Sequence, residues 1–142
     1  MSQVLSYEHA PAGQTDVLDG FVCELRDESF DVAWVHLAGE LDIASAARLE
    51  GMLRRAQLRA RLVVLDLRDL TFMDSRGVRV IVYANLRARR AGRRLVLLRG
   101  PSQIQRLFAL SGASELLQIV DLAPGEPAVQ VLLQLAHDDP AA

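Results

Sequence analysis

The spacing of apolar side chains along the first part of the chain predicts two strands. Residues 21–26 alternate apolar and polar side chains, which is typical of a half-buried strand. A second stretch, which begins at residue 32, places Ala33, Val35 and Leu37 on one face. A turn-rich segment of about five residues separates the two stretches. They are predicted to form an antiparallel hairpin.

Four later segments space their apolar residues as helices do, and short apolar runs lie between them. The helical segments are residues 43–58, 75–91, 102–111 and 127–136. Asp42 or Ser45 is expected to cap the first of them. The runs between the helices are residues 61–67, 93–99 and 117–122. The first of these runs shows almost no alternation, which predicts a central strand covered on both faces.

The order of these elements predicts an α/β fold. Two strands are followed by helices that alternate with strands, which favours a mixed, mainly parallel sheet with an N-terminal antiparallel hairpin and covering helices. We expect a flexible lead-in over residues 1–19, a single domain over residues 20–137 and an acidic tail over residues 138–142. Functional groups in such sheets gather where strands end and helices begin, which directs attention to residues 66–79.

Composition excludes several classes of protein. The chain has 142 residues, a formal net charge of -2 and one cysteine, Cys23, so it forms no internal disulfide. The longest uncharged apolar stretch, from Val80 to Leu86, is far shorter than the roughly 20 residues that cross a membrane. The N-terminus lacks the basic start and apolar block of a secretion signal. We therefore expect a cytoplasmic protein that does not insert into membranes.

One segment, DLRDLTFMDSRGVRV, carries candidate chemistry at a strand-to-helix junction. It places Asp74, Ser75 and Gly77 where a helix begins. The first amides of a helix lack partners and together carry about half a positive charge, so a phosphate on Ser75 would be accepted there. Gly77 is expected to leave open backbone beside the hydroxyl. The alternative is structural, with Ser75 as a helix cap and Asp74 as a turn residue.

Three stretches resemble one known family. FMDSRG, preceded by VVLDLRDL, resembles the signature of the STAS family, the domain of sulfate transporters and anti-sigma factor antagonists. AGELDIASA, residues 38–46, is similar to the family's Gly-Glu-Leu-Asp loop, and QRLFALSG, residues 105–112, resembles its third helix. The matches follow the family's order and spacing from Phe21 to Asp121. A single STAS-type domain is therefore expected.

The resemblance implies a bacterial partner switch rather than an enzyme. Ser75 corresponds to the family's phosphorylated serine, and Asp42 and Asp74 match positions near the kinase contact. The unmodified protein is expected to bind an anti-sigma factor with serine kinase activity, which frees a sigma factor that the protein contacts only indirectly. Phosphorylation would switch it off, and a serine phosphatase would reset it. No cofactor and no metal are expected.

Two residues depart from the family's commonest pattern. Arg76 stands where a second small residue is usual, and Arg79 also replaces a small residue. Together with Gly77 they are candidate partner contacts, because their guanidinium groups can pair with a phosphate or with acidic residues of a partner. They leave open a second role for the protein, as a scaffold or transporter-accessory module that is not phosphorylated.

A serine hydrolase is a more remote alternative. Ser75, Asp121 and His137 follow the chain order of one hydrolase class, but residues 73–77 lack the first glycine of G-x-S-x-G. A metal site is not favoured, because His9, His36 and His137 have no ligand spacing.

Two further groups of charged residues are better explained without a ligand. Asp66 and Asp69 lack the glycine-rich loop of a magnesium-phosphate site, so structural capping is favoured for them. Residues 87–94 contain five arginines near a helix end, but no aromatic residue is interleaved among them. Nucleic-acid binding is therefore not favoured. Trp34, on the outer face of its strand, is expected either to contact a partner or to pack against the N-terminal lead-in.

Overall fold

The computed structural model describes residues 13–28 and 31–122, which form one sheet with three helices and a short 3-10 helix. The elements are β1 Gln14–Leu18, β2 Phe21–Glu28, β3 Val32–Leu41, α2 Ile43–Arg59, β4 Leu62–Met73, α3 Ser75–Arg90, β5 Arg94–Leu98, α4 Ser102–Leu110, the 3-10 helix Ala113–Glu115, and β6 Gln118–Val120. The helix predicted over residues 127–136, the acidic tail and the first part of the lead-in lie outside the described residues.

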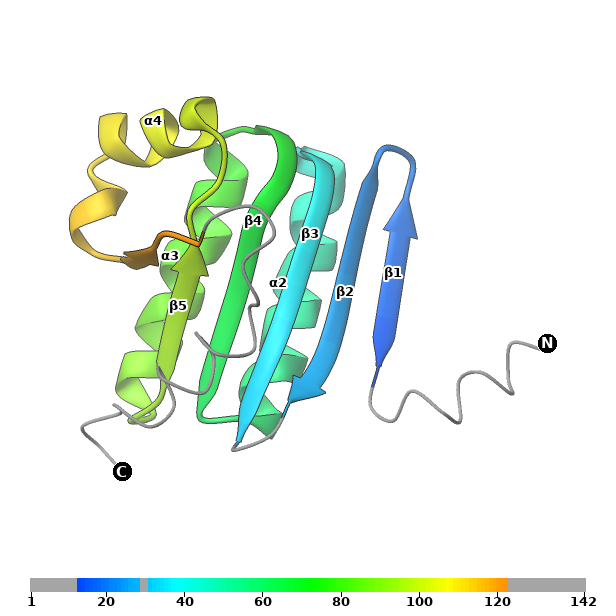
Figure 1. Cartoon of the computed structure of the whole chain (residues 1–142), viewed down its shortest axis with the longest axis vertical. Coiled ribbons are helices and arrows are strands. Elements are labelled where there is room, and N and C mark those ends of the chain that lie inside the picture. The colour runs from blue at the N-terminus through cyan, green and yellow to red at the C-terminus, as the bar shows by residue number, and fades with distance from the viewer. Residues whose placement is uncertain (1–12, 29–30, 123–142) are drawn as a thin grey trace, which may run out of the picture.

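The sheet has six strands in the order β1-β2-β3-β4-β5-β6 (Figure 1). β1, β2 and β3 are antiparallel neighbours, whereas β3, β4, β5 and β6 run parallel. This arrangement confirms the mixed sheet with an N-terminal hairpin, and β4 occupies the interior position expected from its apolar run.

The expectation of a flexible lead-in is wrong for residues 14–18, because they form strand β1 along the edge of the sheet. Leu18 pairs with Phe21, so only Asp19 and Gly20 connect β1 to β2. Gly20 has a φ of 78°, in the left-handed region that lets a glycine complete so short a turn. Side chains of β1 alternate between exposed and half-buried, which is the pattern of a strand packed on one side only.

Helices α2 and α3 cover one face of the sheet, behind the strands in Figure 1. Their buried side chains, among them Leu49, Leu53 and Ile81, pack with Val35, Leu65 and other strand residues into the main core. Each fully buried leucine or isoleucine contributes roughly 1.5–3 kcal/mol of burial free energy. This layer fixes both helices against the strands.

The opposite face of the sheet carries a second apolar cluster. It consists of Val32, Leu62, Val64, Val96, Leu98 and Leu122, with Trp34 packed against it. Alternate residues of β4 therefore serve different clusters, because Val63 and Leu65 lie in the main core. The prediction that this strand is buried on both faces is confirmed. Trp34 is half-buried against this second cluster, and the first part of the lead-in, against which it was expected to pack, lies outside the described residues.

Parallel strands followed by helices bring three helix starts to one edge. β3 and β4 end at the upper edge in Figure 1, β5 points toward it but ends lower, and α2, α3 and α4 begin at this edge. The candidate residues of the strand-to-helix junction lie at this edge.

Candidate partner-binding site

The starts of α2 and α3 are neighbours because the strands before them are paired. Leu41, the last residue of β3, is in register with Met73, the last residue of β4. The amide of Asp74 donates a hydrogen bond to the carbonyl oxygen of Leu41 at 3.2 Å. Asp42 and Asp74 therefore cap two adjacent helices. We call the surface formed by Asp42, Asp74 and Ser75 the helix-start edge.

Asp42 caps α2 through a capping box. Its Oδ1 accepts hydrogen bonds from the amides of Ala44 at 3.0 Å and Ser45 at 3.2 Å, while its own amide donates to Ser45 Oγ at 2.9 Å. The hydrogen bond from the Ser45 amide is the main reason that the pKa of Asp42 is lowered from its usual value. Asp42 therefore keeps its charge at the helix-start edge.

Asp74 performs the same task for α3, which leaves Ser75 without a structural role. Asp74 is the N-cap, and its Oδ1 accepts a hydrogen bond from the Arg76 amide at 2.9 Å. Ser75 is the first residue of the helix and is exposed. Its hydroxyl has no hydrogen-bond partner in the described part of the chain. The alternative in which Ser75 caps the helix is thereby replaced by a cap at Asp74.

Gly77 has a different role from the one expected, because it is buried and faces inward. A Cβ at this position would lie 2.7 Å from Met73 Cγ and 2.8 Å from Leu41 Cδ2. Glycine thus allows the first turn of α3 to pack closely on the ends of β3 and β4. The open backbone that the sequence suggested beside the hydroxyl is filled by these two side chains, so Gly77 offers no surface to a partner.

Arg76 and Arg79 are both exposed on α3, beside the helix-start edge. Arg76 Nη1 lies 3.9 Å from Asp74 Oδ2, a long ion pair at a surface position. Such a pair contributes little free energy, so the Arg76 side chain can be redirected toward another anion at small cost. No hydrogen bond or ion pair joins Arg79 to any described side chain.

Two exposed apolar side chains at this edge were not identified from the sequence. Ile43, the first residue of α2, is 63% exposed, and Phe72, next to the end of β4, is 47% exposed. Phe72 interrupts the alternation of its strand, since both Thr71 and Phe72 are exposed. The sequence carries no matching signal, because Phe72 continues the apolar-polar alternation of Leu70 and Thr71. Protein interfaces have an apolar centre, enriched in aromatic side chains, and a polar rim, so these two side chains suit the centre of an interface and the charged caps suit its rim.

Residues 27–126 match the family model of the STAS domain. The chain belongs to the STAS domain family. An anti-sigma-B factor antagonist of Listeria monocytogenes is 30% identical to it over 97 residues, which cover 68% of this chain and 85% of that protein.

Solved structures support the same fold for this STAS domain. The anti-sigma factor antagonist SpoIIAA in its unphosphorylated form is 23% identical, with a TM-score of 0.65 over 79% of this chain and 96% of that one. The Bacillus cell fate determinant SpoIIAA in its phosphorylated form is 22% identical, with a TM-score of 0.62 over 77% and 98% of the two chains. These similarities show the fold.

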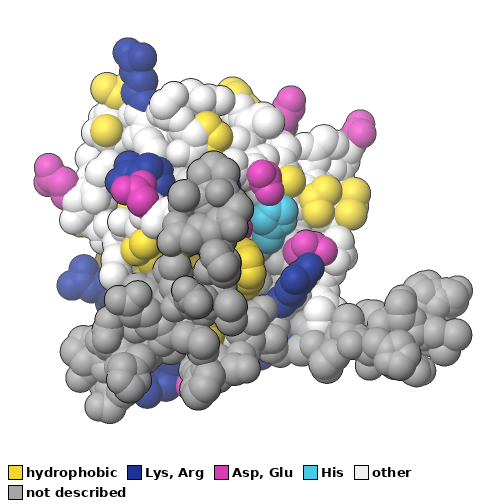
Figure 2. All heavy atoms as spheres, viewed as in Figure 1, with side chains coloured by type: hydrophobic (Ala, Val, Ile, Leu, Met, Phe, Trp, Pro, Cys, Tyr) yellow, Lys and Arg dark blue, Asp and Glu magenta, His cyan; other side chains and the backbone are white. Residues whose placement is uncertain are grey.

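The STAS domain holds its other candidate residues away from Ser75. His36 lies on the front face of the sheet, where its Nε2 is 2.7 Å from Asp69 Oδ2 and its Nδ1 is 3.8 Å from Glu24 Oε1; Figure 2 shows this histidine among charged side chains. Asp121 accepts a hydrogen bond from Arg99. His9 and His137 lie outside the described residues, so the hydrolase triad has no described histidine beside Ser75.

The acidic pair Asp66 and Asp69 is also explained by protein contacts. Asp66 is 1% exposed and accepts three hydrogen bonds from Arg68, one from the amide and two from the guanidinium group. Bonding to Asp66 raises the pKa of Arg68. No group of three potential metal ligands occurs among residues 13–28 and 31–122. In the same residues, no helix is long and apolar enough to cross a membrane.

Proposed function

We propose that the protein is an anti-sigma factor antagonist that binds an anti-sigma factor with serine kinase activity through the helix-start edge. The exposed Ser75 hydroxyl carries the proposal, because it begins a helix that Asp74 already caps. The name of the Listeria relative supports the class of partner, and the phosphorylated form of SpoIIAA supports a phosphorylated state. Since these partners control transcription, we expect the exchange to occur in the cytoplasm.

Phosphorylation of Ser75 is proposed to weaken binding by charge rather than by refolding. A phosphoserine adds about -1.5 to -2 charges. If it faces one acidic group of the partner at about 5 Å, with an effective dielectric constant near 20, each added charge costs about 3 kcal/mol. Each added charge therefore corresponds to a loss of affinity of roughly 100-fold. The start of α3 tolerates the anion, because its unpaired amides favour negative charge by about 0.3–1 kcal/mol.

Asp42 and Asp74 are proposed to contact the partner, together with Ile43 and Phe72. The two carboxylates lie at adjacent helix starts and the two apolar side chains are exposed beside them. Arg76 and Arg79 are proposed to set the choice of partner, because their exposed guanidinium groups suit acidic residues. The sigma factor is proposed to be released indirectly, because the protein binds the anti-sigma factor. A serine phosphatase is proposed to restore the unmodified state.

The test combines binding with phosphorylation. Wild type, Ser75→Ala and Ser75→Asp are titrated against a candidate serine-kinase anti-sigma factor, and each is incubated with the kinase and ATP before mass spectrometry. We expect Ser75→Ala to bind like wild type and to gain no phosphate, and Ser75→Asp to bind at least tenfold more weakly. Ser102→Asp is the matched control, because Ser102 is an exposed first residue of α4.

Two results would contradict the proposal. One is equal binding by wild type, Ser75→Ala and Ser75→Asp with no phosphate transferred, which favours a scaffold that is not switched. The other is phosphate transfer to the Ser75→Ala variant, which places the modification at another residue.

A further inference from the structure

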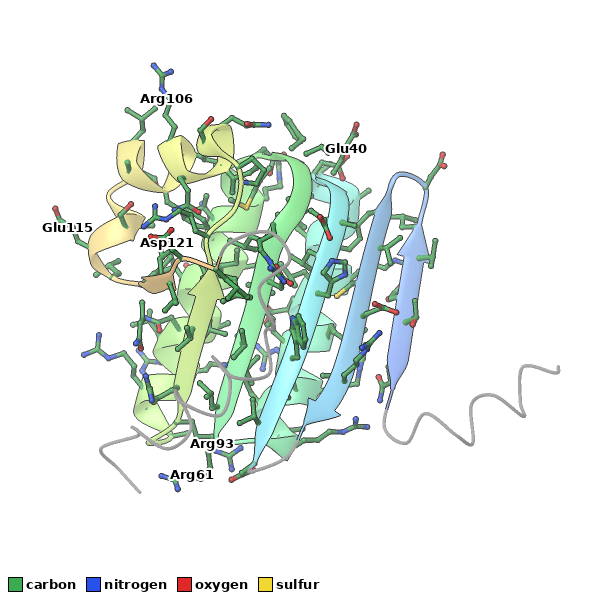
Figure 3. All side chains as sticks on the ribbon, in the orientation of Figure 1. Glu40, Arg61, Arg93, Arg106, Glu115 and Asp121 are labelled. Atoms are coloured by element: carbon green, nitrogen blue, oxygen red, sulfur yellow. The ribbon has the colours of Figure 1, made fainter. Side chains whose placement is uncertain are left out.

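The last turns of α2 and α3 enclose a groove of about 570 Å³. Four arginines line it, Arg54, Arg87, Arg90 and Arg93, together with apolar groups from Leu58, Ala88 and Ala91. We call it the arginine groove. Because α2 and α3 lie behind the sheet, the groove is on the side of the molecule hidden in Figure 2. Arg93 marks its lower end in Figure 3, away from the upper edge where α3 begins.

Positive charge in the groove is only partly compensated. Glu50 Oε2 accepts from Arg54 Nε at 2.7 Å and lies 3.1 Å from Arg87 Nη1. In the described part of the chain, Glu50 is the one carboxylate that pairs with any of the four arginines, and Arg90 has no hydrogen-bond partner for its side chain. Two of the four guanidinium groups thus pair with one carboxylate and the other two pair with none among the described residues, so the groove attracts anionic groups.

Arg87 adds a specific donor. Its Nε donates to Gln57 Oε1 at 3.2 Å and its Nη1 to Glu50, but its Nη2 is buried and has no hydrogen-bond partner. A buried donor on a charged group without an acceptor is costly. Arg87 lines the groove, so an oxygen atom of a ligand would provide the missing acceptor once the guanidinium group turns toward the groove.

The groove also presents apolar surface. Leu58 is 82% exposed at its rim, and Ala88 is buried at its base. A leucine this exposed gains free energy when a partner covers it. Aromatic side chains, on which nucleobases stack, are missing from the described residues that line the groove.

We propose that the arginine groove binds an acidic segment of a partner protein in which carboxylates flank an aliphatic side chain. The carboxylates pair with Arg54, Arg87 and Arg90, and the aliphatic side chain covers Leu58. Ser75 and Arg90 are the first and last residues of α3, which places them roughly 22 Å apart at 1.5 Å per residue. The groove is therefore a second surface, which can be occupied while the helix-start edge is engaged.

The test uses fluorescence anisotropy with a labelled synthetic peptide that carries glutamates and leucines at helical spacing. We expect binding that weakens as salt rises, and no binding of the same peptide with glutamine in place of each glutamate. Arg90→Glu should weaken binding about tenfold or more, since it replaces attraction by repulsion. Leu58→Ser should also weaken binding. Arg106→Glu is the matched control, because Arg106 is exposed on α4 near the upper end in Figure 3.

Three results would overturn the proposal. Equal losses in Arg90→Glu and Arg106→Glu would show attraction to net charge alone. Competition by inorganic phosphate or an oligonucleotide at lower concentrations than the unlabelled peptide would assign the groove to a different ligand. Loss of peptide binding in Ser75→Asp would place the peptide at the helix-start edge. Peptide binding that survives Ser75→Asp supports the groove, whatever the outcome for the kinase partner.

Discussion

Replacement of Gly77 by alanine tests whether close packing holds the start of α3 in place. The added Cβ would lie 2.7 Å from Met73 Cγ and 2.8 Å from Leu41 Cδ2. Carbon atoms prefer a separation of about 3.5–4.0 Å, so each contact is about 1 Å too short. Leu41 is fully buried and Met73 nearly so, which leaves both side chains little room to move.

The size of the effect follows from two opposing contributions. Overpacking of a core costs about 1–3 kcal/mol, and alanine in place of glycine inside a helix gains about 1 kcal/mol. Gly77→Ala should therefore be about 1 kcal/mol less stable than wild type. Gly51→Ala is the matched control, because Gly51 lies inside α2 and its nearest neighbour is Arg55 Nη1 at 3.5 Å. That variant should gain up to about 1 kcal/mol.

Urea unfolding of wild type and both variants, followed by circular dichroism, measures the difference. We expect the two variants to differ by about 2 kcal/mol, with Gly51→Ala the more stable. If Gly77→Ala proves as stable as Gly51→Ala, the first turn of α3 has space for a side chain. The packing argument for Gly77 would then be wrong.

Three further predictions concern stability. Asp42→Ala should be less stable than wild type at neutral pH in urea unfolding, and the gap should close as pH falls below about 3.9, because the lowered pKa of Asp42 stabilises the fold only while the carboxylate is charged. Burial raises the pKa of Cys23 from 9.0 to about 12, so thiol reagents should react only on unfolding, and stability should fall as pH rises from 9.0 toward 12. Arg68→Ala should cost about 2–4 kcal/mol in thermal or urea unfolding, since it leaves the buried Asp66 carboxylate with a backbone donor alone, whereas a loss near zero would show that water replaces the guanidinium group.

The helices and the interior strand could be predicted because each has a strong local pattern. Residues 43–58 were predicted as a helix, and α2 runs from Ile43 to Arg59. A helix was also predicted over residues 75–91, and α3 runs from Ser75 to Arg90. The run at residues 61–67 gave β4, which continues to Met73 in the structure. In these segments burial follows directly from helical spacing or from an unbroken apolar run.

Strand β1 was missed because it is short and only half covered. It contains Gln14, Thr15 and Asp16, which lack the apolar run of an interior strand. The one available signal was the Asp-Gly pair at residues 19–20, since such pairs often close hairpins. Weak strands at an edge are specified by their neighbour, here β2, more than by their own side chains.

The roles of Gly77 and Phe72 depend on contacts that no local pattern encodes. The side chains of Leu41 and Met73 leave no room for a Cβ at residue 77, and Leu41 is distant from this residue in sequence. Phe72 belongs to an apolar strand, and yet it is 47% exposed. The sequence therefore located the helix-start edge. The structure adds which side chains there are buried and stabilise the fold, such as Gly77, and which are exposed to solvent, such as Phe72.

Ser45 and Ser75 lie near the starts of neighbouring helices, and a comparison of the two shows why Ser75 is the better position for a phosphate. Ser45 is 1% exposed, and its hydroxyl is bonded to the Asp42 amide at 2.9 Å and the Glu40 carbonyl oxygen at 3.0 Å. A phosphate there would break the capping box and enter the protein interior. Ser75 is exposed, and Asp74 has already satisfied the cap. In the proposed switch, a kinase would therefore reach Ser75 in the folded protein, and the added charge would change the surface while the helices beneath it keep their hydrogen bonds.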